Sequence, residues 1–187
     1  IKEKSWKTLM IGRLLVKCLE RCLPKFLMTG KMEMISNNRS IGILDYGIGN
    51  LKSISNAIER LGHNACIISC LDKPINFSHL IIPGVGSFGQ CARKINELIS
   101  VDDLNELVLH MKIPTLGICV GMQLMCVSSD EDATAQGFGW FTEKIKKLNF
   151  SNSERVPHVG WNEVSFKNAF LGFSENSCSH FYFDHSF

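Results

Sequence analysis

A cysteine between two glycines is the pattern in this chain with the clearest chemical potential. The run Gly117-Ile118-Cys119-Val120-Gly121 follows the apolar stretch 113–116. A nucleophile with a glycine two residues away on each side, at the end of a strand, is typical of a sharp strand-to-helix turn that lifts its side chain clear of the backbone. The thiolate of cysteine is a strong nucleophile. The spacing therefore makes Cys119 a candidate for covalent catalysis, with a small buried core cysteine as the alternative interpretation.

A glycine-rich loop, Gly84-Val85-Gly86-Ser87-Phe88-Gly89, has the spacing of a dinucleotide-binding fingerprint. That fingerprint belongs to the first strand of its unit, whereas this loop follows the third expected strand. The acidic residue expected about 20 residues later, at the end of the next strand, is also missing. We therefore predict no nucleotide cofactor. Main-chain N–H groups in such a loop, next to a nucleophile, can instead donate hydrogen bonds to an oxyanion.

The elements around these loops alternate between strand and helix. Short apolar runs predict strands at 41–44, 65–68, 79–82 and 115–118, and helical spacing predicts helices at 51–61, 91–99 and 104–110. This alternation indicates an α/β fold with a mostly parallel sheet and helices on both faces. Sites in such sheets form at the carboxyl ends of the strands. We therefore expect the loops at 45–50, 83–88 and 117–121 to lie on one edge.

Beyond Gly137 the pattern changes to strands without intervening helices, at 141–150, 163–166 and 180–183. We expect these segments to form an antiparallel or mixed extension of the sheet.

Composition and charge divide the chain of 187 residues into two parts. Its 45% hydrophobic and 20% charged residues are typical of a globular protein with one substantial core. Residues 1–39 carry nine basic and three acidic residues, whereas residues 40–187 have a net charge of −4. We interpret 1–39 as a basic N-terminal extension and 40–187 as the functional domain. The extension, with a basic amphipathic helix near 14–23, could be a presequence, a membrane-surface element or translated upstream sequence.

The net negative charge of residues 40–187 argues against a nucleic-acid partner. The sequence also has no apolar run long enough to span a bilayer, so we expect no membrane partner for this domain. The eight cysteines lack convincing zinc spacing, and several lie in apolar stretches. We therefore expect no metal site. We also expect the cysteines to be reduced thiols, as in a cytoplasmic protein.

Five motifs occur in order from about Ser40 onward: 41–51, 83–88, 117–123, 156–162 and 182–187. They resemble those of class I glutamine amidotransferases, and more closely the glutaminase subunits of imidazole glycerol phosphate synthases. The resemblance implies a flavodoxin-like fold, no cofactor, and a heterodimer with a (β/α)-barrel cyclase that receives the ammonia. It also implies that Cys119 attacks the side-chain amide of a glutamine substrate.

The same resemblance implies roles for further residues. Those expected around the substrate or its oxyanion are Gly84, Val85, Gly86, Val120, Gln123, Glu131 and Ser186. Glu131 matches the family position that holds the amino group of glutamine. Asn50, Trp161 and Tyr182 match positions near the face on which the cyclase docks, although a role for Trp161 as a core or edge aromatic stays an alternative.

The departure from the family pattern concerns the base. The family places a His-x-Glu element near its carboxyl end, and none of the six histidines in this sequence is followed two residues later by glutamate. We therefore expect the domain to lack its C-terminal part, and the chain as given to have little or no glutaminase activity.

Three alternatives stay open at this point. Within the family, the chain could supply ammonia to an enzyme that aminates a surface sugar. It could be a non-catalytic pseudo-glutaminase that acts only as a binding module. It could also be a cysteine hydrolase on the same fold, although this leaves Gln123 and the C-terminal motifs unexplained.

Overall fold

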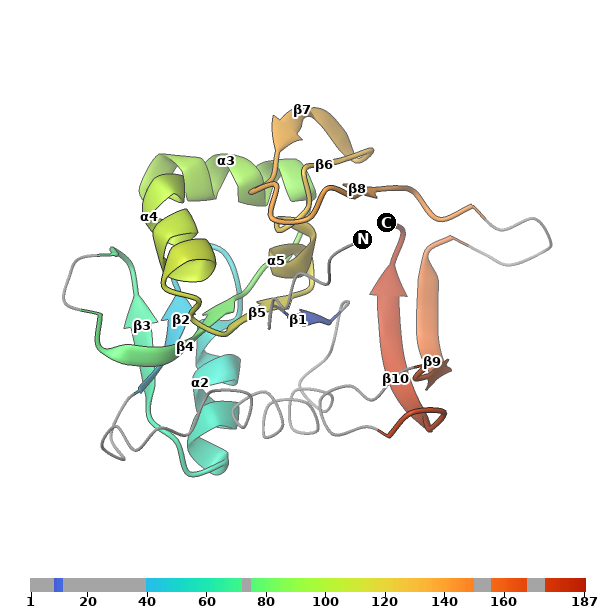
Figure 1. Ribbon diagram of the computed structural model, residues 1–187. Coiled ribbons are helices and arrows are strands. Elements are labelled where there is room, and N and C mark those ends of the chain that lie inside the picture. Colours follow the sequence, from blue (N-terminus) through green and yellow to red (C-terminus); the bar gives the residue numbers. More distant parts are fainter. Residues whose placement is uncertain (1–8, 12–39, 72–74, 150–155, 168–173) are drawn as a thin grey trace.

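The computed structural model describes residues 9–11, 40–71, 75–149, 156–167 and 174–187 (Figure 1). The amphipathic helix expected near 14–23 lies outside the described residues. None of the helices in the described ranges is long and apolar enough to cross a bilayer.

The centre of the fold is a parallel sheet of five strands in the order β1-β5-β4-β2-β3. Its strands are β1 (Leu9–Ile11), β2 (Ser40–Leu44), β3 (Ala65–Ile68), β4 (Phe77–Ile82) and β5 (Thr115–Ile118). The three central strands, β2, β4 and β5, are almost entirely buried, as expected when both faces of a parallel sheet are covered. The α/β prediction is therefore confirmed.

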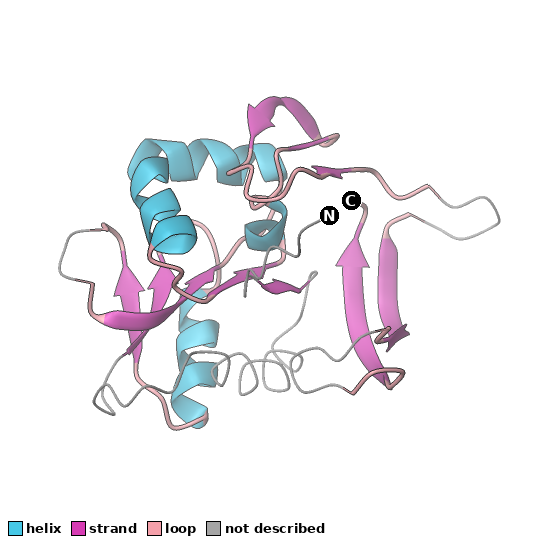
Figure 2. Cartoon of the chain, in the orientation of Figure 1, coloured by secondary structure: helices cyan, strands magenta, loops and turns pink. Residues whose placement is uncertain are grey.

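Helices cover both faces of this sheet, with α2 on one side and α3 and α4 on the other (Figures 1 and 2). The helices are α2 (Leu51–Arg60), α3 (Phe88–Leu98), α4 (Val101–Asn105), the π-helical turn η1 (Glu106–His110) and α5 (Val120–Gln123). Asn50 caps α2 by accepting a hydrogen bond from the N–H of Ser53 at 3.2 Å. Gly62, with a φ of +80°, follows the end of that helix. The expected helix at 104–110 is in fact divided between α4 and η1.

The edge strand β1 comes from the basic N-terminal segment. Leu9 pairs with Leu116, and Ile11 with Ile118, in parallel register. Residues 9–11 thus form part of the sheet, next to the strand that ends immediately before Cys119. A strand of three residues is too short to show a hydrophobic periodicity, so the sequence pattern did not predict β1.

The second half of the chain forms two small sheets that are separate from the main one. One contains β6 (Ser128–Ser129), β7 (Asp132–Gln136) and β8 (Lys144–Ile145), and the other is the antiparallel ribbon of β9 (His158–Ser165) and β10 (Cys178–His185). The expectation that these strands extend the main sheet is therefore wrong for the described residues, although the antiparallel pairing of β9 and β10 is confirmed. Within 141–149, only Lys144–Ile145 is a strand.

A buried histidine in β4 makes the stability of the fold depend on pH. His79 is 8% exposed, and its Nδ1 lies 3.0 Å from the hydroxyl of Ser78. Burial, with a smaller effect from His63, lowers the pKa of His79 from 6.5 to about 4. The unfolded chain therefore binds a proton between these pH values that the folded chain does not. Stability is fully present above pH 6.5 and falls as the pH drops towards 4.

We expect His79→Leu to reduce this loss of stability, which amounts to about 3 kcal/mol at most. Urea unfolding at pH 7 and pH 4.5 would measure it, with the exposed His110→Gln as the matched control. Equal pH dependence in wild type and His79→Leu would contradict the assignment.

Candidate active site

Cys119 lies at the junction of β5 and α5 with an unusual backbone conformation. Its φ is +57° and its ψ is −121°, in a region that residues with a side chain rarely adopt. Such strain costs roughly 1–3 kcal/mol and is concentrated at functional sites. The strand-to-helix turn that the sequence predicted is therefore present, with the thiol at its tip.

The two glycines flanking Cys119 permit this turn because no side chain would fit. A Cβ on Gly117 would lie 2.5 Å from the Cα of Met122. A Cβ on Gly121 would overlap the carbonyl oxygen of Ile82, at the end of β4. The turn is thus packed against the backbone of the neighbouring strand. Cys119 itself is 9% exposed, so its surroundings are largely closed.

The glycine loop after β4 lies directly against this turn. A Cβ on Gly84 would overlap the main-chain nitrogen of Gly121, so the two segments are in backbone contact. Gly86 has a φ of +86°, which favours glycine. The expected convergence of the loops after β4 and β5 is therefore confirmed. Gly89, the third glycine of the apparent dinucleotide fingerprint, lies inside α3 and contacts Asp132 instead.

Two side chains hold the glycine loop through the carbonyl groups of Pro83 and Val85. The hydroxyl of Tyr46, which is fully buried, donates to the carbonyl oxygen of Pro83 at 2.6 Å. The thiol of Cys91 donates to the carbonyl oxygen of Val85 at 3.3 Å. Burial raises the pKa of both the Tyr46 hydroxyl and the Cys91 thiol, so both stay protonated donors at neutral pH. Tyr46 also joins the loop after β2 to this site.

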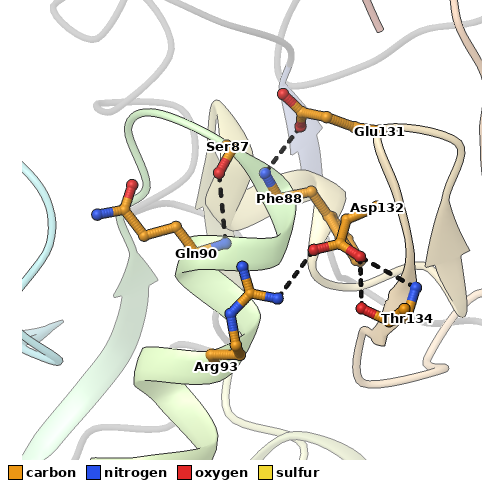
Figure 3. Close-up of polar contacts among 7 residues, drawn as sticks. All are labelled: Ser87, Phe88, Gln90, Arg93, Glu131, Asp132 and Thr134. Atoms are coloured by element: carbon orange, nitrogen blue, oxygen red, sulfur yellow. Dashed lines mark hydrogen bonds and ion pairs between the residues drawn. The ribbon is translucent and has the colours of Figure 1, made fainter.

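Glu131 lies in the turn between β6 and β7, and one of its oxygens accepts a hydrogen bond from the first N–H of α3. Glu131 Oε2 is 2.8 Å from the main-chain nitrogen of Phe88 (Figure 3). Unpaired N–H groups at a helix start favour such a carboxylate. The structure thus connects Glu131 to the same loop-helix unit that carries Gly84 and Gly86.

Gln123 contacts the segment that follows β10, in which Ser186 lies. Gln123 is 6% exposed, and its Nε2 donates a long hydrogen bond of 3.5 Å to the carbonyl oxygen of Phe187. The carbonyl oxygen of Ser186 accepts from the N–H of Leu148 at 2.8 Å. The end of the ribbon therefore contacts the helix that begins after Cys119.

Two histidines on the ribbon, His158 and His185, form a hydrogen bond with each other. The Nδ1 of His158 lies 3.2 Å from the Nε2 of His185, and the Nδ1 of His185 lies 3.0 Å from the carbonyl oxygen of Phe187. His158 also stacks on Phe183, with ring centroids 4.8 Å apart. These histidines are thus engaged within the ribbon. No group of three or more His, Cys, Asp or Glu side chains in the described ranges could hold a metal ion.

The residues expected to face a partner include an exposed aromatic pair. Trp161 on β9 is 59% exposed and packs edge-on against Tyr182 on β10, with centroids 5.8 Å apart. This exposure excludes the core position that the sequence left open for Trp161. Asn50 is exposed and also caps α2.

The sequence analysis did not identify several of these contributions. Tyr46 lies within a quoted motif, yet only its contact with Pro83 reveals what the hydroxyl does. Arg93 and Asp132 form an ion pair of 2.8 Å although they are 39 residues apart in the chain. No local spacing relates such residues, so no sequence pattern could have found this pair.

Comparison with known proteins identifies a family and several relatives of this chain. Residues 42–187 match the family profile described as "Glutamine amidotransferase class-I". The chain is 42% identical over 151 residues to "Imidazole glycerol phosphate synthase subunit HisH" of Leptospira interrogans, covering 79% of this chain and 74% of that protein. It is 41% identical over 150 residues to "Imidazole glycerol phosphate synthase subunit HisH 2" of Methanococcus maripaludis, covering 79% and 73%.

A solved structure shares the fold. It is described as "Crystal structure of glutamine amidotransferase" and superposes with a TM-score of 0.60 at 17% identity, over 77% of this chain and 70% of that chain.

Proposed function

Because this chain belongs to the class I glutamine amidotransferase family, we propose that it hydrolyses glutamine as the glutaminase subunit of an imidazole glycerol phosphate synthase. The observation that carries the proposal is the positive φ of Cys119, at a turn whose next residues contact the loop at Gly84. The names of the relatives support this assignment over a sugar-aminating partner enzyme.

In this mechanism the Sγ of Cys119 attacks the side-chain amide carbon of glutamine. The resulting oxyanion accepts hydrogen bonds from main-chain N–H groups, for which Val85 and Val120 are the candidates, in a site completed by Gly84 and Gly86. Each such donor contributes roughly 3 kcal/mol to transition-state stabilisation. The intermediate collapses to a thioester and expels ammonia, and water then releases glutamate. Gln123, Glu131 and Ser186 are the candidates for binding the remainder of the substrate.

A partner that receives the ammonia follows from the chemistry. Ammonia released into water is protonated and no longer acts as a nucleophile, so the acceptor site must be joined to the glutaminase. The relatives are named as synthase subunits, which supports a heterodimer with a cyclase. The exposed pair of Trp161 and Tyr182, together with Asn50, is our candidate docking surface. The six cysteines in the described ranges are free thiols, which supports a cytoplasmic location.

The catalytic base is the one component of the proposed mechanism for which these 187 residues contain no matching motif. No histidine is followed two residues later by glutamate. His158 and His185 are hydrogen-bonded to each other in the ribbon. A cysteine glutaminase needs an oriented base to form the thiolate and to protonate the leaving ammonia. We therefore propose that these 187 residues turn over glutamine very slowly on their own.

Labelling with an electrophilic analogue tests the proposed site directly. The chloroketone analogue of glutamine should alkylate Cys119 alone among the eight cysteines, and an excess of glutamine should protect it. Peptide mass spectrometry would locate the adduct. Cys119→Ser should abolish labelling, whereas Cys178→Ser, which removes an exposed thiol, should leave it unchanged. Labelling spread over several thiols, or insensitive to glutamine, would contradict the assignment.

A further inference from the structure

The turn that carries Glu131 is attached to α3 by a second carboxylate. Asp132 Oδ2 lies 2.8 Å from Nη1 of Arg93, in the middle of α3 (Figure 3). The other oxygen, Oδ1, accepts hydrogen bonds from the hydroxyl of Thr134 at 2.7 Å and from its N–H at 3.0 Å. Both oxygens of Asp132 are therefore engaged, one by the helix and one by its own strand.

Gly89 allows this attachment to be close. A Cβ at Gly89 would overlap Oδ2 of Asp132 and would lie 2.7 Å from its Cγ. The Asp132 carboxylate therefore lies against the bare backbone of the first turn of α3. Bonds from Thr134 and from Arg93 lower the pKa of Asp132 to about 2, so this carboxylate is ionised throughout the neutral range.

The neighbouring residue, Glu131, uses one carboxylate oxygen for a hydrogen bond to α3, and its other oxygen is available to a ligand. Oε2 accepts from the N–H of Phe88 at 2.8 Å, and the N–H of Glu131 donates to the buried Oγ of Ser129 at 3.1 Å. Oε1 accepts no hydrogen bond from the residues that the structure describes, and Figure 3 shows it turned away from the Phe88 N–H. Glu131 is exposed, so a ligand can reach this oxygen.

We infer that Asp132 is a positioning residue for substrate specificity: with Arg93 and Thr134 it holds Glu131 so that Oε1 faces the amino group of glutamine. The inference rests on the proposed function, in which Glu131 binds that amino group. A carboxylate fixed at one oxygen loses less rotamer freedom when it binds an ammonium group, so the discrimination for that group improves. Without the clamp, defined here as Arg93, Asp132 and Thr134, Glu131 keeps its charge but loses its fixed direction.

Two substitutions break the clamp without touching Glu131. Asp132→Asn keeps an acceptor for Thr134 but presents no charge to Arg93, and Arg93→Met removes the guanidinium. The matched control is Lys94→Met, which removes an ion pair of 2.9 Å with Glu97 on the same helix, away from the turn. Glu131→Gln is the reference for complete loss of the charge.

The first readout needs no substrate. Hydrogen exchange of the Phe88 amide reports directly on its bond to Glu131. We expect it to accelerate in Asp132→Asn, Arg93→Met and Glu131→Gln, and to stay at the wild-type rate in Lys94→Met. An unchanged Phe88 exchange rate in Asp132→Asn would overturn the inference, whatever the protein binds.

The second readout compares glutamine with glutaramate, which has the same amide but lacks the α-amino group. The measurement is the ligand concentration that half-protects Cys119 from iodoacetamide. For glutamine we expect this concentration to rise about two- to fivefold in Asp132→Asn and about tenfold in Glu131→Gln. For glutaramate it should stay at the wild-type value. In the Glu131→Gln background, Asp132→Asn should have no further effect.

The outcomes separate the inference from the proposed function. Equal weakening of both ligands in Asp132→Asn would show a general structural role and overturn the specificity role. If glutamine fails to protect Cys119 in the wild type while Phe88 exchange still responds to Asp132→Asn, the proposed function fails and the specificity role fails with it. Only glutamine-selective weakening, together with faster Phe88 exchange, supports the inference.

Discussion

Replacing Gly121 with alanine should destabilise the whole domain, although alanine is the better helix former. The new Cβ would overlap the carbonyl oxygen of Ile82 and lie 2.8 Å from that of Pro83. Both neighbours are backbone atoms of the central sheet and its following loop, so no rotamer change relieves the contact. We expect a loss of about 3 kcal/mol or more in the free energy of unfolding, which exceeds the roughly 1 kcal/mol gained in helix propensity.

Urea unfolding would measure this loss, and the rate of Cys119 alkylation would report on the turn itself. Gly62→Ala is the matched control, because a Cβ there meets nothing within 4 Å and only the positive φ of +80° opposes it. That variant should lose about 1 kcal/mol and alkylate normally. An unfolding midpoint for Gly121→Ala at or above that of Gly62→Ala would contradict the packing argument.

Glutamate release by these 187 residues should be slower than that of a complete cysteine amidotransferase by a factor on the order of 10⁵. The expectation follows from the proposed mechanism, in which the nucleophile is present without an oriented base. Loss of the base alone costs roughly as much as loss of the whole triad. The measurement is glutamate formed per Cys119, with Cys119→Ser as the blank. Added imidazole, as a free base, should raise the rate only when Cys119 is intact.

Turnover of about 1 per second or faster, which is ordinary for enzymes, would contradict this expectation. One of the six histidines would then act as the base. Variants at His158 and His185 would identify it first, because this pair lies on the ribbon whose end contacts Gln123. A variant that abolished the turnover would replace the proposed mechanism with one that uses a different base.

The local sequence is enough to predict most elements of the central sheet, because each strand or helix is stabilised in part by residues close to it in the chain. Short apolar runs give β2, β3, β4 and β5 within two residues of their observed bounds. The turn at Cys119 was also predictable, since only glycine fits at 117 and 121 and both are in the local pattern. The site roles beyond this geometry stay predictions that the labelling and protection experiments test.

Other features depend on contacts between residues far apart in the chain. The strand Leu9–Ile11 is defined by its pairing with β5, more than 100 residues later, and not by its own composition. The ribbon of β9 and β10 pairs with itself and not with the main sheet, because backbone hydrogen bonding alone does not specify which edge a strand joins.

The sequence by itself therefore determined the family, the α/β alternation and the turn that carries the candidate nucleophile, all of which are encoded in short spacings. Only the tertiary structure decided how the segments around the candidate site are held: the hydroxyl of Tyr46 on Pro83, the thiol of Cys91 on Val85, and the Arg93–Asp132 pair beside Glu131. The physical reason is that a hydrogen bond or an ion pair depends on distance in space. Chain folding brings these partners together from positions whose separation in sequence carries no signal.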